Sequence, residues 1–198
     1  MTKTKTCSKC GINKPASEYS RWKLSKDGLY SRCKECHKHE NNTEHQVIKR
    51  FLNAHKNRLT CTKTYSEDKF IQWLYDNNFQ EMYDAWKEAK YDKSIAPSVD
   101  RIDSRKGYDL SNMQLITWDF NHLKKTIDVW NERGYTGITS GKTRHRASHS
   151  FFGEMEVATF NTFTEAYQWK LKRIKNIIKY LNENNIKTVL VEGYTNEK

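Results

Sequence analysis

The sequence predicts an α+β fold assembled from small modules. Three observations carry this prediction: two Cys-x-x-Cys pairs near the start, two short β-like runs in the middle, and glycine-separated β-like pieces before a long amphipathic helix near the end. Hydrophobic residues form only 36% of the 198 positions, which favours several small cores. We expect a cysteine module at residues 1–40, helices supporting a strand-strand-helix motif at 41–131, and a basic three-stranded sheet with a helix at 132–198.

The net charge of +11 is unevenly distributed along the chain. Residues 1–60 hold 14 Lys and Arg against 5 Asp and Glu, residues 61–121 hold 8 against 11, and residues 122–179 hold 11 against 5. An acidic centre between basic flanks favours nucleic-acid binding, and the plainer alternative is a soluble basic protein. Because no stretch is apolar enough to span a membrane and Met1–Thr6 is polar, we expect a cytoplasmic protein without a membrane partner.

The cysteine module contains Cys7 and Cys10 and, after 22 further residues, Cys33 and Cys36. Two such pairs at this separation favour a tetrahedral zinc site, because each pair supplies two thiolates from one tight turn. Four thiolates would fill the coordination shell, so the expected zinc ion is structural.

Two alternatives to this ligand set are weaker. Disulfides are disfavoured in a cytosolic protein, and replacement of Cys36 by His37 or His39 does not fit the paired spacing. The remaining Cys61 is interpreted as a plain thiol. Basic residues are spread through the module. We expect its lysines to contact the phosphates of DNA more often than the bases.

Helical spacing of apolar residues continues through the following segment. One amphipathic helix is predicted over residues 43–59, a second from Ser66, and a third over residues 79–89. Their aromatic residues are interpreted as core, and His55 as a packed or surface residue. These helices would support the two-strand motif, which is too small to bury itself.

The central stretch Pro97–Lys125 alternates β-like runs with polar turn residues. Residues 98–102 and 113–116 are predicted to be strands, and Thr117 or Asp119 then caps a helix. A strand, a second strand and a helix in this order are compact enough to bring side chains from all three elements together.

Three polar residues of this stretch would meet at one point: Asp100 on the first strand, Asn112 before the second, and Asn121 on the helix. A carboxylate with amide oxygens nearby suits a Mg²⁺-like ion that keeps some of its waters. The alternative is that Asp100, Asp103 and Asn112 are ordinary turn residues.

This stretch resembles the ββα-metal motif of HNH endonucleases, in the form common in phage and mobile-intron nucleases. The resemblance implies a metal-dependent endonuclease that hydrolyses DNA phosphodiester bonds with Mg²⁺ or Mn²⁺. It implies that Asp100 and Asn121 bind the catalytic ion and that Asn112 braces the loop. Lys124 and Lys125 lie where they would bind the DNA backbone.

One position departs from the family pattern. Arg101 replaces the family's general-base His, and because its guanidinium stays protonated it cannot take a proton from water. Asp103, His122 and a metal-bound hydroxide are the candidates for that role, while Arg101 would contact phosphate. If none of them serves, the chain is a non-catalytic DNA-binding protein on the same scaffold, which is the main alternative function.

The C-terminal region combines basic β-like pieces with a clear helix. Gly141 and Gly153 separate the β-like pieces, Thr162-Phe-Thr-Glu165 is a capping box, and an apolar stripe follows it. A further short strand is expected at residues 188–191.

This region resembles the APETALA-type DNA-binding module, which also occurs in phage and homing endonucleases. The resemblance is carried by Gly137-Ile138, Arg146-Ala147, Gly153 and Phe160–Ala166. In that family the sheet enters the major groove of DNA. The side chains that the resemblance would turn toward DNA are those of Lys142, Arg144, His145, Arg146 and His149. The alternative is a small basic appendage that only packs on the core.

The combined prediction is a phage-encoded, homing-like endonuclease that acts on double-stranded DNA in the host cytoplasm. It would carry a structural zinc ion and a catalytic Mg²⁺ or Mn²⁺ ion and use no small-molecule substrate. An RNA-directed nuclease or RNA-binding zinc protein fits the charge but not the central motif.

Overall fold

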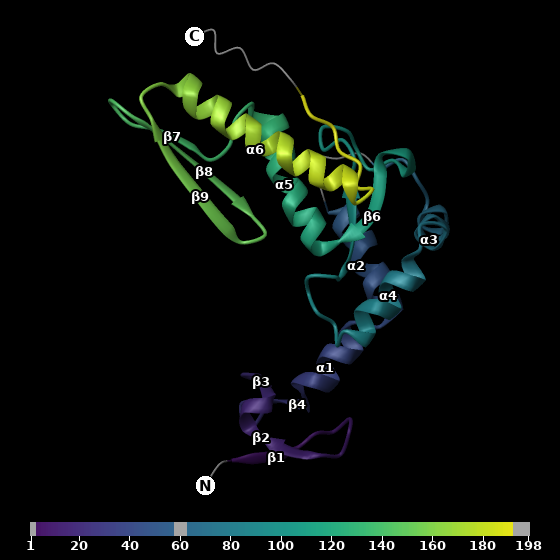
Figure 1. The fold of residues 1–198 in the computed structure, drawn as a ribbon. Coiled ribbons are helices and arrows are strands. Elements are labelled where there is room, and N and C mark those ends of the chain that lie inside the picture. Colours follow the sequence, from purple (N-terminus) through teal and green to yellow (C-terminus); the bar gives the residue numbers. More distant parts are fainter. Residues whose placement is uncertain (1–2, 58–62, 192–198) are drawn as a thin grey trace. The chain divides into compact units, whose positions relative to one another are not determined.

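The structure is a computed structural model that describes residues 3–57 and 63–191, so the prediction for Cys61 lies outside the described residues. The architecture is mixed α+β, with small sheets between helices (Figure 1). Two compact units, Met1–Asn53 and Ala54–Lys198, divide the chain within helix α2 (Glu44–Lys56). None of the helices in the described residues is long and apolar enough to cross a membrane.

The first unit consists of short strand pairs around a very small core. Its elements before α2 are β1 (Thr4–Thr6), β2 (Asn13–Pro15), η1 (Ala16–Glu18), β3 (Tyr19–Arg21), β4 (Leu29–Cys33) and α1 (Lys34–Asn41). β1 pairs with β2 and β3 with β4, both antiparallel. The buried cluster of this unit is Cys7, Tyr19 and Cys33, with Leu29 and Cys36 packed against it. Because this core is mostly cysteine, its apolar burial alone provides little stability.

The second unit begins with two helices and then carries the strand-strand-helix motif. Its elements are α3 (Glu67–Asp76), α4 (Phe79–Glu88), β5 (Pro97–Arg101), η2 (Leu110–Asn112), β6 (Met113–Thr117), α5 (Trp118–Arg133), β7 (Ile138–Ser140), β8 (His145–Phe151), β9 (Glu154–Phe160) and α6 (Phe163–Glu183). β5 and β6 form one antiparallel pair, and β7, β8 and β9 form an antiparallel sheet in that order.

Local sequence signals explain where these helices begin and end. The Ser66 side chain accepts a hydrogen bond from the backbone amide of Lys69 at the start of α3. Both hydrogen bonds of the Thr162–Glu165 capping box form at the start of α6. Gly134 ends α5 with a φ of 72°, a conformation that glycine adopts without steric cost.

Helices α5 and α6 lie side by side and share one hydrophobic core (Figure 1). The buried members of this core are Ile116, Leu123, Ile127, Trp130, Ile174, Ile177, Leu181 and Ile186. The C-terminal sheet and helix belong to the same unit as the central motif.

The three-stranded sheet presents alternate residues of β8 to helix α6. Ala147 and His149 are buried on the side of α6, whereas Arg146 before them and Ser150 after them are exposed. His149 lies close to the buried Lys170 of α6, whose Nζ is 3.4 Å from the His149 Nδ1. The expectation that His149 faces DNA is therefore wrong, because strand alternation turns it inward.

The expected strand at residues 188–191 does not form. Side-chain amides hold this segment instead: Asn131 donates to the Val189 carbonyl and accepts from the Val191 amide, at 2.6 and 2.9 Å. Gln114 binds both the amide and the carbonyl of Lys187 in the same way. Each side-chain amide donates one hydrogen bond to this segment and accepts one from it, so the segment is held in place without a neighbouring strand.

Candidate functional site

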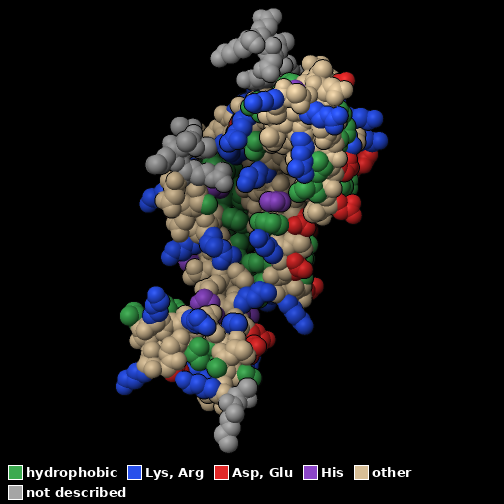
Figure 2. Space-filling model, turned by 90° about the vertical axis from the view of Figure 1, so that its left-hand side faces the viewer, with side chains coloured by type: hydrophobic (Ala, Val, Ile, Leu, Met, Phe, Trp, Pro, Cys, Tyr) green, Lys and Arg blue, Asp and Glu red, His purple; other side chains and the backbone are tan. Residues whose placement is uncertain are grey.

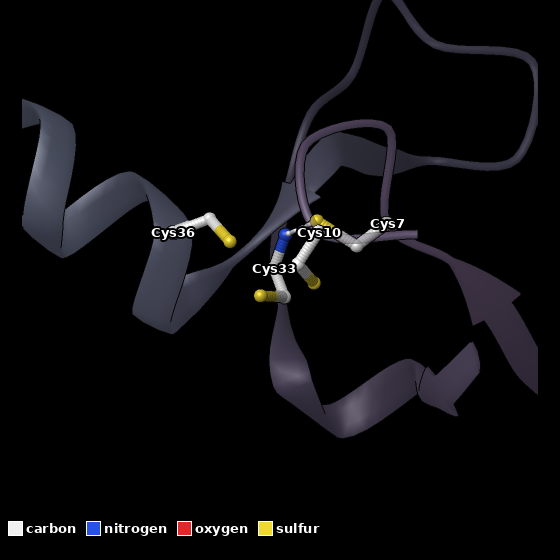
Figure 3. Close-up of side chains that lie close together, drawn as sticks. All are labelled: Cys7, Cys10, Cys33 and Cys36. Atoms are coloured by element: carbon white, nitrogen blue, oxygen red, sulfur yellow. Dashed lines mark hydrogen bonds between the residues drawn. The ribbon is translucent and has the colours of Figure 1, made fainter. Parts of the chain in front are cut away.

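Four cysteine side chains converge in the first unit (Figure 3). Cys7 and Cys10 come from the turn after β1, Cys33 from the end of β4, and Cys36 from the first turn of α1. Their sulfur atoms all lie within 4.8 Å of one another. Such a cluster of four thiols can bind a metal ion such as zinc. His37, the alternative ligand, instead packs against Tyr30, with 5.0 Å between the ring centroids.

The backbone of the first unit already favours ionised sulfur at this cluster. The amides of Lys9 and Cys33 point at the Cys7 sulfur, with nitrogen-to-sulfur distances of 3.4 and 3.2 Å. Burial alone would raise the pKa of Cys7, but hydrogen bonds from the backbone, Cys10 first among them, lower it to about 6. A side-chain hydrogen bond with Cys33, together with burial, raises the pKa of Cys36 to about 12. Without a cation the Cys36 thiol therefore stays protonated at neutral pH.

In the second unit, the loop between β5 and β6 is braced by Asn112. The Asn112 amide nitrogen donates to the carbonyls of Asp103 and Gly107 at 3.1 and 3.0 Å, and its oxygen accepts from the Asp103 backbone amide at 3.0 Å. The Asp103 carboxylate forms an ion pair with the Arg105 guanidinium, with 2.9 Å between nitrogen and oxygen. That contact lowers the pKa of Asp103.

Asp100 lies on β5 and is only 6% exposed. Gln114, its register partner on β6, donates to the Asp100 Oδ2 at 2.9 Å, and the Lys124 ammonium lies 3.4 Å from the same oxygen. Burial raises the pKa of Asp100, and the charge of Lys124 opposes this rise without cancelling it. The carboxylate is thus held in a fixed orientation by two neighbours.

Lys124 does not lie on the surface where DNA contact was expected. Its side chain is fully buried, and its Nζ lies 2.7 Å from Asp128 Oδ1 and 2.8 Å from the carbonyl oxygen of Arg101. Two carboxylates and a carbonyl therefore surround one ammonium group. The sequence-based role of Lys124 is corrected to that of an internal counter-ion. The neighbouring Lys125 is exposed.

A cleft of about 310 Å³ opens where the strand pair meets α5. It is lined by Val99, Asp100, Arg101, Ser104, Tyr108, Asn121, Lys125, Asp128, Val129 and Glu132. Four predicted site residues, Asp100, Arg101, Asn121 and Lys125, thus share one cleft. Asp103, Asn112 and Lys124 do not line this cleft. Asn112 braces the neighbouring loop, and Lys124 is the counter-ion of Asp100. His122, one candidate base, lines a different cleft on α5.

Two of the predicted residues are oriented by specific contacts. The Arg101 guanidinium donates to the Lys106 carbonyl at 2.9 Å and lies over the buried ring of Tyr108, 5.3 Å from its centroid. The Asn121 amide nitrogen donates to the Ser98 hydroxyl at 2.7 Å. The amide oxygen is thus the atom of Asn121 that can bind a cation.

Sequence reasoning missed four polar residues of the cleft: Ser104, Tyr108, Asp128 and Glu132. A helical pattern would have indicated two of them, because positions 121, 125, 128 and 132 fall on one face of a helix. Burial raises the pKa of Asp128, while Lys124 opposes this effect. The buried Ser104 hydroxyl lies near Asp128 but makes no hydrogen bond of normal geometry within the described residues. An unsatisfied buried hydroxyl beside a carboxylate indicates a place for a water molecule or an ion.

Comparison with protein-family models, curated proteins and solved structures finds no match.

The C-terminal basic residues occupy different positions on the sheet. Lys142 and Arg144 are exposed in the turn between β7 and β8, and Arg146 is exposed on β8. His145 is half-buried, pairs with the Ser140 hydroxyl at 2.9 Å and contacts the ring of Phe163. Figure 2 shows Lys and Arg side chains spread over the visible face of each unit.

Proposed function

We propose that the protein is a metal-dependent DNA endonuclease of the HNH type. The observation that carries the proposal is the shared cleft, where Asp100, Arg101, Asn121 and Lys125 meet beside a loop braced by Asn112. A carboxylate, an amide oxygen and two cationic side chains in one cleft suit a phosphodiester with a divalent cation.

Asp100 and the Asn121 amide oxygen would hold the cation, Mg²⁺ or Mn²⁺. This donor set fits such an ion because both groups are hard oxygen ligands, and the unsatisfied Ser104 hydroxyl adds a third oxygen to the cleft. When bound, the ion would supply stabilisation of the charge on phosphorus and on the leaving 3′ oxygen.

Arg101 and Lys125 would orient the phosphodiester. Arg101 is held by the Lys106 carbonyl and the Tyr108 ring, so its guanidinium loses little freedom when it binds phosphate. In the reaction, a water oxygen bonds to phosphorus while the bond to the 3′ oxygen breaks. Glu132 also lines the cleft and would take the proton of that water, whereas Asp128 is in an ion pair with Lys124. Asp103 is bound to Arg105, and His122 faces another cleft.

We also propose that the four cysteines hold a structural zinc ion and that the basic surfaces of both units bind double-stranded DNA. Four thiolates leave no open coordination position for chemistry. The exposed side chains of Lys142, Arg144 and Arg146 extend the basic surface of the second unit. With a net charge of +11, DNA affinity should fall steeply as salt increases.

The test is cleavage of phage and bacterial DNA in Mg²⁺ or Mn²⁺. Wild type should cut, while Asp100→Asn and Asn121→Ala should lose about 100-fold or more of the rate and still bind DNA. Asp68→Asn, which changes an exposed carboxylate on α3, is the matched control and should cut normally. Equal cutting by wild type and both site variants would contradict the proposal.

A second function, non-catalytic DNA binding, is favoured by one specific pair of observations. Arg101 stands where a general base is expected, and the Lys124 ammonium already neutralises Asp100 at 3.4 Å. If wild type binds DNA in a salt-sensitive manner but cuts with neither metal, this second function replaces the first.

A further inference from the structure

A second cleft, of about 290 Å³, lies between α5 and the turn of the β8–β9 hairpin. One wall comes from the first turns of α5 and includes Trp118 and His122, and the other comes from the hairpin and includes Phe152. Neither the cation-binding residues nor Arg101 line it. Its walls are aromatic, whereas the first cleft is mainly charged.

The aromatic wall on α5 is a preformed stack. The rings of Trp118 and His122 lie nearly parallel, with 4.9 Å between centroids and 10° between planes. The Lys93 ammonium lies 4.0 Å from the centre of the Trp118 ring. His122 is exposed, so the stack ends at the cleft in a flat surface that another ring can cover.

The opposite wall displays Phe152 at a conformational cost. Phe152 and Gly153 form the two-residue turn of the hairpin with φ values of 46° and 88°. Positive φ at both positions usually selects Asn-Gly, and it is strained for a bulky residue. The Phe152 ring is nevertheless 49% exposed and rests on Tyr180, 5.5 Å between centroids. A strained turn that holds an exposed aromatic ring indicates a contact role for that ring.

The polar groups of the cleft indicate the class of ring that fits between these walls. Asp119, Thr126 and Ser150 contribute a carboxylate and two hydroxyl groups to the lining. A carboxylate repels phosphate but accepts hydrogen bonds from the exocyclic amino group of a base. Aromatic faces with such groups at their edge suit a nucleobase.

The two clefts lie on adjacent faces of one helix. Asn121 and Lys125 line the first cleft, and His122 and Thr126, each one residue further along α5, line the second. Consecutive residues of an α-helix are separated by 1.5 Å along the axis and by about 100° around it, so the clefts lie at the same level of α5 on two adjoining sides. A DNA strand that follows α5 from one side to the next can therefore place a phosphate in the first cleft and a nearby base in the second.

We propose that the second cleft binds one unstacked base of the DNA whose phosphate occupies the first cleft. The proposal rests on the proposed function, because it takes DNA as the ligand. The base lies against His122 and Phe152, with its edge toward Asp119. The preferred DNA is then locally unpaired or distorted next to the bond that is cut.

The test is equilibrium binding of the full-length protein, without added Mg²⁺ or Mn²⁺, to two short duplexes. One duplex is fully paired, and the other carries a single unpaired base at its centre. Stacking of one base should make the protein bind the second duplex about 5- to 140-fold more tightly than the first. His122→Ala and Phe152→Asn should abolish the preference. Tyr135→Ala, which removes another exposed aromatic ring, should retain it.

Phe152→Asn separates binding from folding. Asn is favoured at this position of the turn, so the variant should melt at the same temperature as wild type or higher while losing the preference. If wild type binds both duplexes equally, or if Phe152→Asn keeps the preference, the base site is overturned and the nuclease proposal stands. If neither duplex is bound, both proposals fail. If free deoxynucleoside monophosphates compete as well as the DNA does, the cleft binds a free nucleotide and the proposal is overturned.

Discussion

The cysteine cluster and the Asp100 cleft are both groups of potential metal ligands, but they balance their charge in opposite ways. At the cluster, four sulfur atoms lie within 4.8 Å with backbone amides directed at Cys7. At the cleft, the Lys124 ammonium already contacts Asp100 and Asp128. The first site can take an external cation, whereas the second contains a cation of its own.

This difference has structural consequences. The cluster around the cysteines holds only Tyr19 besides Cys7 and Cys33 as buried members, so we expect a metal that neutralises the thiolates to stabilise this part of the first unit. The second unit, which contains the cleft, has the shared hydrophobic core of α5 and α6 instead. We infer that metal removal should unfold the first unit and leave the second folded.

Cysteine substitution should give the largest effect. Cys33→Ser removes a fully buried ligand, and structural zinc in comparable small modules contributes about 10–16 kcal/mol. We expect about one zinc ion per chain in wild type, none in the variant, and loss of amide protection confined to residues 3–53. Elemental analysis and hydrogen exchange measure both.

Cys61→Ser is the matched control for that experiment, because Cys61 belongs to neither pair. It should keep the zinc content and the exchange pattern of wild type. A folded first unit in metal-free protein would remove the contrast between the two sites.

Substitution of Lys124 tests the internal cation of the cleft. Lys124→Met leaves Asp100 and Asp128 buried without their counter-ion, which should reduce the free energy of unfolding by about 3–5 kcal/mol. Lys125→Met changes the exposed neighbour and should cost less than about 0.5 kcal/mol. Urea denaturation compares the two variants.

Added Mg²⁺ or Mn²⁺ sharpens this comparison. If the vacated carboxylates bind a divalent cation, the metal should restore stability to Lys124→Met more than to wild type, by linkage. Equal losses for Lys124→Met and Lys125→Met would show that the buried ammonium is not the counter-ion described here.

Features encoded by neighbouring residues could be predicted from the sequence. The two Cys-x-x-Cys pairs, the Thr162–Glu165 capping box, and the strands of the central motif each depend on a local pattern. The hydrogen bonds of the Asn112 side chain are local in the same sense, because its partners lie within nine residues of it.

Features that depend on distant contacts could not be predicted. Lys124 and Lys125 are adjacent residues of the same type, so the sequence does not distinguish them. Only the packing of α5 against β5 buries Lys124 and leaves Lys125 exposed. Asn131 fixes the segment near Val189 across 58 residues without any strand pattern. The shared core of α5 and α6 likewise joins two regions whose sequences suggest separate modules.

Lys170 and His149 form a third buried site to compare with the cysteine cluster and the cleft. Substitutions there should change the free energy of unfolding least. Lys170 is buried without a carboxylate: its Nζ donates to the Ser148 carbonyl at 2.6 Å and lies near His149. Burial lowers the pKa of Lys170 to about 8, and burial followed by the charge of Lys170 lowers the pKa of His149 to about 4. Unlike the cleft, this pair lacks a compensating negative charge in direct contact among the described residues.

The lowered pKa values of His149 and Lys170 determine how the stability of the fold depends on pH. Between pH 6.5 and about 4 the unfolded chain binds a proton at His149 that the folded chain does not, so stability should fall as the pH falls through this range. Between about pH 8 and 10.5 the unfolded chain keeps a proton that the folded chain has lost from Lys170, so stability should rise with pH. Urea midpoints of wild type, His149→Asn and Lys170→Met across this range measure both slopes. Each variant should lose one slope and keep the other, and a variant that keeps both would contradict the assignment of the buried pair.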